Sequence, residues 1–350
     1  FPDKAIDAMD EAGAWKGQKL EEKGERLEVT EADVAYVVSR MSGVPVQRVA
    51  QTEGEQLRQM NKVLKQRVIG QDKAIDTIVR AIQRSRMGLR NPNKPIGTFF
   101  LLGPTGVGKT HLAQCLAEEM FGNRDAIVRF DMSEYIEKHT VSLLVGAPPG
   151  YVAHEEGGKL TEAVRRKPYS IVLFDEIEKA HADIFNILLQ VMDEGRLTDR
   201  QGRVVDFRNT VIIMTSNVGT RQLNEFGSGI GFNADVIDET QTEQMLTKAL
   251  NRTFPPEFVN RLDNVVVFHP LNDDALAQIL TLELHPLKLR LDAMGYQLQL
   301  TKKTKEQLLT QSRDRKYGAR PLKRAIQTLV EDPITDMLLS GEIENNILKI

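Results

Sequence analysis

Residues 103–110 have the sequence GPTGVGKT, which matches the G-x-x-x-x-G-K-[ST] pattern of a phosphate-binding loop. The apolar run GTFFLLG precedes this stretch, and the helical pattern THLAQCLAEEM follows it. In such a strand–loop–helix context, backbone N–H groups and a helix N-terminus can surround a phosphate. We therefore predict a nucleotide site in which Lys109 reaches the β- and γ-phosphates and the Thr110 hydroxyl binds Mg²⁺. The predicted loop residues are Gly103, Pro104, Thr105, Gly106, Val107, Gly108, Lys109 and Thr110.

Four more short apolar runs follow the one before the loop. They are AIVRFD (126–131), SIVLFDE (170–176), TVIIMTS (210–216) and NVVVFHP (264–270). Runs of this length, mostly rich in β-branched or aromatic residues and separated by helical segments, are typical of a parallel sheet covered on both faces. The predicted fold class is therefore α/β, with five parallel strands. A hairpin turning at Gln201–Gly202 is expected between the third and fourth runs.

Polar residues stand where these strands end. Asp175 and Glu176 follow the third run, at the carboxyl end of a strand, where ligands bind in open α/β sheets. We predict that Asp175 holds Mg²⁺, directly or through water, and that Glu176 polarises the attacking water. Asn217 ends the fourth run, beside the expected γ-phosphate. Arg261 leads into the last run, where it is either a surface ion-pair residue or a group reaching a neighbouring subunit's phosphate.

Three regions are expected along the chain. Residues 1–50 are polar and helical in pattern, with a capping-box spacing between Thr30 and Asp33. Residues 51–270 hold the phosphate loop and all five predicted strands. After Pro270 the pattern is mostly helical, so 271–350 is predicted to be a smaller α+β domain ending in a candidate edge strand, NNILKI.

Composition narrows the class of protein. The 350 residues carry a net charge of −3, whereas a nucleic-acid-binding protein usually has a basic excess, so we expect no nucleic-acid partner. Cys115 is the single cysteine, which fits a reducing, cytoplasmic compartment or an organelle equivalent. The sequence contains no apolar run of roughly 20 residues, so no membrane span is expected. No Ser/His/Asp or Cys/His arrangement indicates a peptidase site, so any peptidase activity is expected to come from another chain.

Taken together, the motifs resemble those of the AAA+ ATPases, and specifically the second ATPase module of the Clp/Hsp100 unfoldases, closer to the ClpC type than to the ClpB type. The resemblance spans roughly residues 43–350. The matching stretches, in order, are RVIGQDKA, GPTGVGKT, DMSEYIEKHTVSLLVGAPPGYV, EEGGKLTEAVRRKPYSIVLFDEIEKAH, GRLTDRQGRVVDFRNT, MTSN, PEFVNRLD and YGARPLKR.

This resemblance implies roles that spacing alone does not assign. Asn217 matches the sensor 1 position and Arg261 the arginine finger, which acts in trans on the neighbour's ATP. Arg320 matches sensor 2, which links the C-terminal lid to the nucleotide, and Val68 and Ile69 match the segment that packs on adenine. The resemblance therefore implies a homo-hexamer that uses ATP and Mg²⁺.

The resemblance also implies a polypeptide substrate. Tyr151 and Val152 lie in the Gly/Pro-rich stretch GAPPGYVAHEEGG and match a pore loop that grips a translocating chain, whereas a buried anchor is the alternative for Tyr151. The family pattern is Gly-Tyr-Val-Gly, but this chain has Ala153 in the last position, which costs the loop some φ freedom. Substrates are expected to be unfolded or tagged chains delivered by adaptors.

The stretch GSGIGFNAD places two large apolar residues among glycines. Ile230, Gly231 and Phe232 match the (Leu/Ile/Val)-Gly-Phe tripeptide with which proteolytic members of the family dock on a barrel-shaped Clp-type peptidase. The competing interpretation is a loop that packs on its own domain. A disaggregase working without a peptidase is the corresponding alternative function. A nucleotide-switched assembly module is another, and it predicts that Tyr151→Ala leaves substrate processing intact.

The N-terminal 50 residues support a double-ring parent. PDKAIDAMDEAGA resembles the end of a first ATPase module, and VTEADVAYVVSRMSGVPV resembles the connector into the second, with 14 residues (15–28) between them. A middle coiled coil is therefore expected to be deleted or absent from this sequence. Because the sequence contains a single phosphate loop, we expect the chain to be a fragment.

Overall fold

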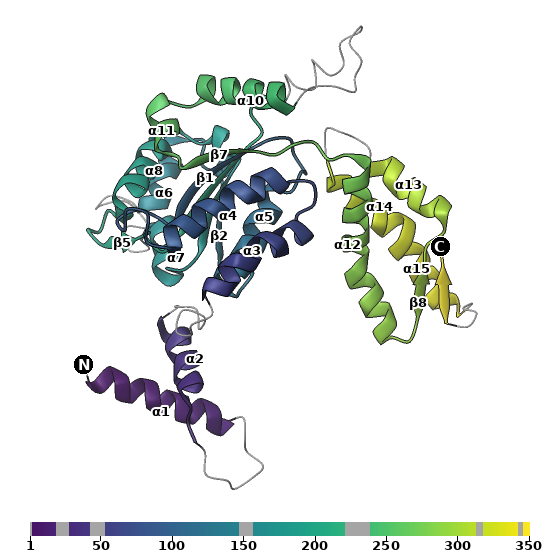
Figure 1. The fold of residues 1–350 in the computed structure, drawn as a ribbon, viewed down its shortest axis with the longest axis horizontal. Helices are drawn as coiled ribbons and strands as arrows, with labels where there is room; N and C mark the ends of the chain where they lie inside the picture. The colour runs from purple at the N-terminus through teal and green to yellow at the C-terminus, as the bar shows by residue number, and fades with distance from the viewer. Residues whose placement is uncertain are drawn as a thin grey trace.

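The computed structural model describes residues 2–18, 28–42, 53–146, 157–220, 239–312, 318–341 and 346–350 (Figure 1). Within these ranges no helix combines the length and apolar character needed to cross a bilayer. The chain forms a central α/β body, a pair of N-terminal helices, and a C-terminal group of helices with a small sheet.

Five parallel strands make up the central sheet, in the order β2-β3-β6-β1-β7. Their bounds are β1 Gly97–Leu102, β2 Ile127–Asp131, β3 Ile171–Asp175, β6 Val211–Ser216 and β7 Asn264–Val267. Each corresponds to one of the five apolar runs, so the predicted α/β class and parallel sheet are confirmed. Every residue of β1, β3 and β6 is buried, which explains why these runs are continuously apolar rather than alternating.

Alternate residues of each strand feed two separate cores. Phe99 and Leu101 face one core, which is closed by α3 (Glu53–Arg67), α4 (Asp72–Arg86) and α5 (Lys109–Phe121). Phe100 and Leu102 face the other, which is closed mainly by α6 (Lys138–Val145), α7 (Lys159–Arg166), α8 (Ala182–Glu194), α10 (Glu239–Thr253) and α11 (Pro256–Arg261). The sheet is therefore a buried middle layer, and its strand ends are where polar groups can meet a ligand.

The predicted hairpin is present between α8 and β6. Its strands are β4 (Arg196–Thr198) and β5 (Val204–Asp206), which pair antiparallel outside the main sheet. The turn is closed by Asp199, whose buried carboxylate accepts hydrogen bonds from the backbone N–H of Gln201 (2.9 Å) and of Arg203 (2.8 Å). Gly202 has a φ of 78°, a left-handed conformation that favours glycine.

Two N-terminal helices pack against each other, α1 (Pro2–Gln18) and α2 (Glu31–Ser42). The expected capping box is present, because the Thr30 N–H donates to Asp33 Oδ2 (2.8 Å) and the Asp33 N–H donates to Thr30 Oγ1 (3.4 Å). Lys16 joins the helices through an ion pair with Asp33 (2.6 Å), and the rings of Trp15 and Tyr36 lie 4.4 Å apart.

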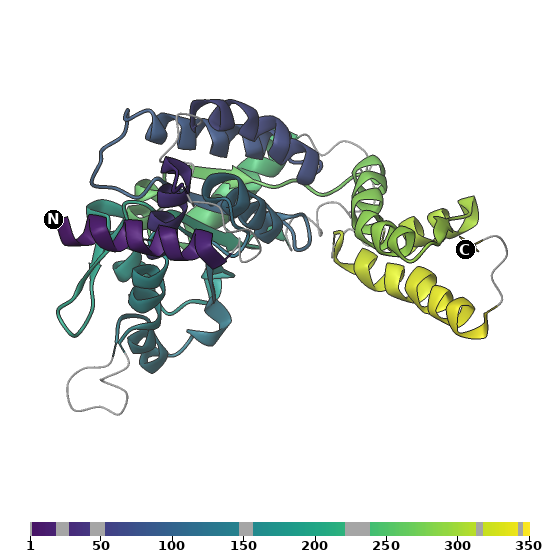
Figure 2. The same ribbon diagram turned by 90° about the horizontal axis from the view of Figure 1, so that it is seen from below.

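The C-terminal group has its own core. It consists of α12 (Asp273–Ala293), α13 (Lys302–Ser312), α14 (Arg320–Ile326), a π-helical segment (Gln327–Glu331) and α15 (Asp332–Ser340). Strands β8 (Gln297–Gln299) and β9 (Ile347–Lys349) pair in parallel, so the expected C-terminal strand is present. In Figures 1 and 2 this group lies beside the α/β body rather than on either face of the sheet. The division of the chain at residues 50 and 270 stays a prediction.

Candidate nucleotide-binding site

The phosphate loop connects β1 to α5, as the sequence predicts. Gly106 and Gly108 have φ values of 78° and 103°, and Gly108 is the residue at which α5 is capped. A side chain would strain both turns, which is why glycine is required at these positions. The loop curls around the Lys109 ammonium, which donates to the carbonyl oxygens of Gly103 and of Pro104 (2.8 Å). The ammonium thus lies where it can meet a phosphate.

Burial lowers the pKa of Lys109 to about 8, because desolvation disfavours the charged form. Three nearby carboxylates, those of Glu178, Asp175 and Glu176, act in the opposite direction and favour the protonated amine. A buried cation with acceptors only on its own loop gains from an anionic ligand, which would replace part of the lost hydration.

Asp175 lies at the carboxyl end of β3 and faces the start of α5. The Thr110 hydroxyl lies 3.5 Å from Asp175 Oδ2, so the two predicted Mg²⁺ ligands meet. The Asp175 carboxylate also accepts from the Thr215 hydroxyl of β6 and from Arg129 Nη2 of β2 (2.7 Å). Hydroxyl and carboxylate oxygens are the protein ligands that Mg²⁺ prefers, so this donor set fits the ion. The role of each residue stays a prediction.

Glu176 is in an unusual backbone conformation, with a φ of 55°. Its backbone N–H donates to Thr215 Oγ1 (3.2 Å), and its carboxylate forms an ion pair with Lys179 three residues later. Left-handed conformations are sparsely populated by non-glycine residues and often occur at functional sites. The turn directs the chain away from β3 directly after the sheet edge, beside Asp175.

Asn217 follows β6 and lies next to the Glu176 turn. Its backbone N–H donates to Glu178 Oε1 (3.3 Å), and its carbonyl accepts from the Thr220 hydroxyl (2.7 Å). Because β3 and β6 are neighbours in the sheet, the ends of these strands bring Asn217 and the acid pair to one edge. The sequence predicts only that Asn217 and the acid pair each follow a strand, whereas the structure shows that the two strands are neighbours.

The C-terminal group contacts the phosphate loop directly. The Ala319 N–H donates to the Gly106 carbonyl oxygen (3.0 Å), and Arg320 is the next residue and the first of α14. Gly318 packs so closely that a Cβ there would lie 2.6 Å from the same Gly106 oxygen. The segment that carries the predicted sensor 2 arginine is therefore anchored to the backbone of the phosphate loop.

We expect Gly318→Ala to weaken nucleotide binding about 10-fold. Its Cβ would push the lid segment off Gly106, and the φ of 57° adds a strain of roughly 1 kcal/mol. Gly341→Ala is the matched control, since Gly341 has a φ of 71° and open space around its Cβ position. Titration with a fluorescent ADP analogue measures the effect. Equal losses in the two variants would show that strain, and not the contact with Gly106, is responsible.

The predicted adenine side is also adjacent to the loop. Val68 is buried and its Cγ1 lies 3.7 Å from a Cβ built on Gly108, and Ile69 follows it half-buried. Gln71, which is 2% exposed, donates through Nε2 to the His269 carbonyl (2.9 Å) and accepts through Oε1 from the His269 N–H (3.1 Å). This pair of bonds ties the segment to the chain beyond β7.

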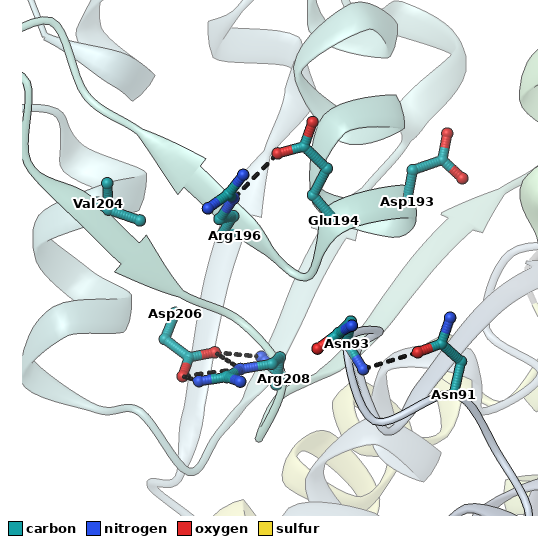
Figure 3. A pocket seen from close by; sticks show the side chains of 8 residues that line it. All are labelled: Asn91, Asn93, Asp193, Glu194, Arg196, Val204, Asp206 and Arg208. Carbon is teal, nitrogen blue, oxygen red and sulfur yellow. Dashed lines mark hydrogen bonds and ion pairs between the residues drawn. The ribbon is translucent and has the colours of Figure 1, made fainter.

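Arg261 ends α11, away from the phosphate loop of its own chain. Its Nη1 pairs with Asp193 of α8 (3.0 Å), and 44% of its side chain is exposed. Asp193 lines an open pocket of about 580 Å³ between α8, the β4–β5 hairpin and residues 91–93 (Figure 3). None of the lining residues comes from the phosphate loop, so this pocket is not the nucleotide site.

Two predicted sites lie outside the described residues. They are the pore-loop residues Tyr151 and Val152, and the docking tripeptide Ile230, Gly231 and Phe232. Both remain predictions from the sequence.

The structure adds residues that sequence reasoning missed. They are Gln71, Arg129, Glu178, Lys179 and Thr215. The available signal was their position, since Thr215 precedes Asn217 by two residues and Glu178 follows Glu176 by two. Arg129 gave a weaker signal, as a charged residue inside an apolar run.

The fold and the site define a class of protein, the phosphate-loop ATPases. In this chain a parallel sheet carries the phosphate loop, and a C-terminal helical group contacts that loop. Comparison with protein families narrows this class. Residues 94–265 match the model described as AAA domain (Cdc48 subfamily), and residues 271–349 match the C-terminal, D2-small domain, of ClpB protein.

Individual relatives agree with these models. The chain is 52% identical over 315 residues to the chaperone protein ClpB of Vibrio vulnificus and 52% identical over 334 residues to the negative regulator of genetic competence ClpC/MecB of Bacillus subtilis. It is 49% identical over 328 residues to the ATP-dependent Clp protease ATP-binding subunit ClpC of Staphylococcus aureus. The chain belongs to the AAA ATPases of the Clp/Hsp100 family, as a second ATPase module.

These matches cover 90 to 94% of this chain but only 36 to 40% of each relative. Nucleotide binding and ATP hydrolysis follow from the family. The family does not establish the activity, substrates or partners of the whole parent protein.

Proposed function

We propose that this chain is the module of an ATP-driven unfoldase that threads polypeptide through the pore of a homo-hexamer. The observation that carries the proposal is the hydrogen bond from Ala319 N–H to the Gly106 carbonyl (3.0 Å). It joins the C-terminal lid to the loop that binds the phosphates. A change in phosphate occupancy therefore acts on the angle between lid and α/β body, and such a change of angle is what moves substrate.

In the proposed hydrolysis step, a water molecule attacks the γ-phosphate of ATP and ADP leaves. Glu176 accepts the proton of that water, and the Asn217 side chain orients it. Lys109 neutralises the charge on the β- and γ-phosphate oxygens. Mg²⁺, held by Thr110 and Asp175, would supply further charge neutralisation at the phosphates. Arg129 pairs with the same Asp175 oxygen as Thr110, so it keeps this carboxylate turned toward the loop.

We assign Arg261 to the neighbouring subunit's ATP. Its exposed guanidinium lies at the end of α11, and the ion pair with Asp193 holds it on the surface without burying it. An arginine that acts in trans requires a closed or spiral ring, in which each site is completed by the next subunit. Arg320 would report the same nucleotide to the lid, from the helix that begins beside Gly106.

On the substrate side, we propose that Tyr151 and Val152 grip the polypeptide and are pulled by the motion of the α/β body. An aromatic side chain provides contact area without reading sequence. The partner that receives the chain is proposed to be a Clp-type peptidase, bound by Ile230, Gly231 and Phe232. The sequence supports this assignment, since two large apolar residues in a glycine-rich segment suit an anchor that enters a separate protein's apolar cleft.

The names of the relatives are compatible with two functions for the parent protein. One is an ATP-binding subunit of a Clp protease, and another is a chaperone protein. A disaggregase predicts that the 230–232 segment binds nothing, and a nucleotide-switched assembly module predicts that Tyr151 is dispensable for substrate processing.

Binding to the host's barrel peptidase tests the proposal. The full-length parent carrying Glu176→Gln, loaded with ATP, is expected to bind tightly, and Ile230→Ala with Phe232→Ala is expected to weaken binding at least about 100-fold, as for a pair of buried anchors. Phe226→Ala in the same segment is the control and should bind as the parent does. Absence of binding by the intact segment would favour the disaggregase.

A further inference from the structure

A third acid lies behind the acid pair. Glu178 belongs to the short 3₁₀ turn Ile177–Lys179 that follows Glu176. Its Oε1 accepts a hydrogen bond from the Asn217 backbone N–H (3.3 Å). Its Oε2 is shielded from solvent and has no hydrogen-bond partner among the described residues. Leaving a buried carboxylate oxygen unpaired is costly, so this position calls for an explanation other than stability.

Glu178 connects the ends of two strands. The strands β3 and β6 are neighbours, and β3 leads to Glu176 while β6 leads to Asn217. Two side chains join the ends beyond the last ladder bond. One is Thr215, whose hydroxyl accepts from the Glu176 N–H (3.2 Å), and the other is Glu178. Without Glu178, the backbone at Asn217 loses this tie to the turn that carries Glu176.

The carboxylate also lies close to the phosphate loop. Burial lowers the pKa of Lys109, and Glu178 is first among the three carboxylates that oppose this effect, ahead of Asp175 and Glu176. Glu178 is half-buried, and its carboxylate lies near enough to the Lys109 ammonium to favour the protonated amine.

We propose that Glu178 is a positioning residue, which holds the Asn217 backbone against the Glu176 turn so that the Asn217 side chain meets the water attacking ATP. The proposal rests on the functions proposed above for Glu176 and Asn217. Glu178 does not touch the reacting atoms, and it acts through Asn217.

Steady-state ATP hydrolysis by the full chain tests this, with ADP affinity and melting temperature measured on each variant. Glu178→Ala is expected to lower kcat roughly 10- to 100-fold, with the Kd for ADP changed less than about 3-fold, because only a group acting in the hydrolysis step is displaced. Glu178→Gln keeps an acceptor oxygen for the Asn217 N–H and should restore kcat to within about 3-fold of the wild type. The control Glu194→Ala, at an exposed position, should leave kcat unchanged.

A double-mutant cycle identifies the route of action. In an Asn217→Ala background, Glu178→Ala should have no further effect on kcat, because the group through which it acts is gone. An equal loss in both backgrounds would overturn the inference, as would a Glu178→Gln variant as slow as Glu178→Ala. If Glu178→Ala does not fold, Glu178→Asp is the substitute variant. It keeps the charge but moves the carboxylate oxygen away from the Asn217 N–H, so its kcat should be low. An Asn217→Ala variant with normal kcat would instead overturn the proposed role of Asn217.

Discussion

Glu176→Gln is expected to lower ATP hydrolysis by about 10²- to 10⁴-fold, the usual loss when a general base is removed. The amide has the same shape as the carboxylate but cannot accept a proton from the attacking water. The left-handed turn at Glu176 depends on its backbone bond to Thr215, which the substitution leaves intact. The ion pair with Lys179 is lost, but both partners are substantially exposed, so the stability change should be small.

Two measurements on the same sample check this expectation. Phosphate release should fall, while binding of a fluorescent ATP analogue should stay within about 3-fold of the wild type, because the phosphate loop is unchanged. Glu194→Gln, which also breaks an exposed ion pair, is the matched control and should hydrolyse ATP normally. If Glu176→Gln hydrolyses ATP at the wild-type rate, the general base must be a residue other than Glu176.

Lys109→Met is expected to weaken ATP binding at least about 100-fold, or roughly 3 kcal/mol, because charge-assisted hydrogen bonds to the β- and γ-phosphates are lost. Methionine has a similar length and an uncharged end, so its side chain still occupies the space inside the loop. Burial lowers the pKa of Lys109 to about 8, which means that the folded protein bears a cost for the charge at neutral pH. Removing the charge should therefore not lower the melting temperature of the nucleotide-free protein.

Calorimetric titration with ATP and a thermal melt without nucleotide measure both consequences. Lys62→Met is the control, because Lys62 is an exposed lysine on α3, away from the loop. A large fall in melting temperature with a proportionate loss of binding would mean that Lys109 serves folding, which its position inside the loop argues against.

The strands of the fold were predictable because burial on both faces leaves a strong signal. The runs containing Phe99, Leu173 and Ile213 each have four consecutive large apolar residues, and all three form interior strands of the sheet. The edge strands β2 and β7 are less uniformly buried, yet turn residues and flanking helices still marked them. What the sequence did not predict was the order β2-β3-β6-β1-β7, since strand order depends on how crossovers pack and not on local pattern.

The site shows the same division. The positions of Lys109 and Thr110 after the loop, and of Asp175 and Glu176 at the end of β3, were predictable from local motifs. Their roles stay predictions. Arg129 and Thr215 were not, because their contacts with Asp175 cross from neighbouring strands β2 and β6. No local sequence pattern records a contact between residues 40 or 46 positions apart.

The sequence by itself determined the phosphate loop, the five buried strands and the residue types at their ends, because glycine geometry, apolar runs and charged residue types are local properties. Only the tertiary structure decided that the Ala319 segment rests on Gly106 and that Glu178 ties Asn217 to the Glu176 turn. These contacts join segments separated along the chain. They exist because packing of the sheet and the C-terminal group brings polar backbone groups together, where each must find a partner.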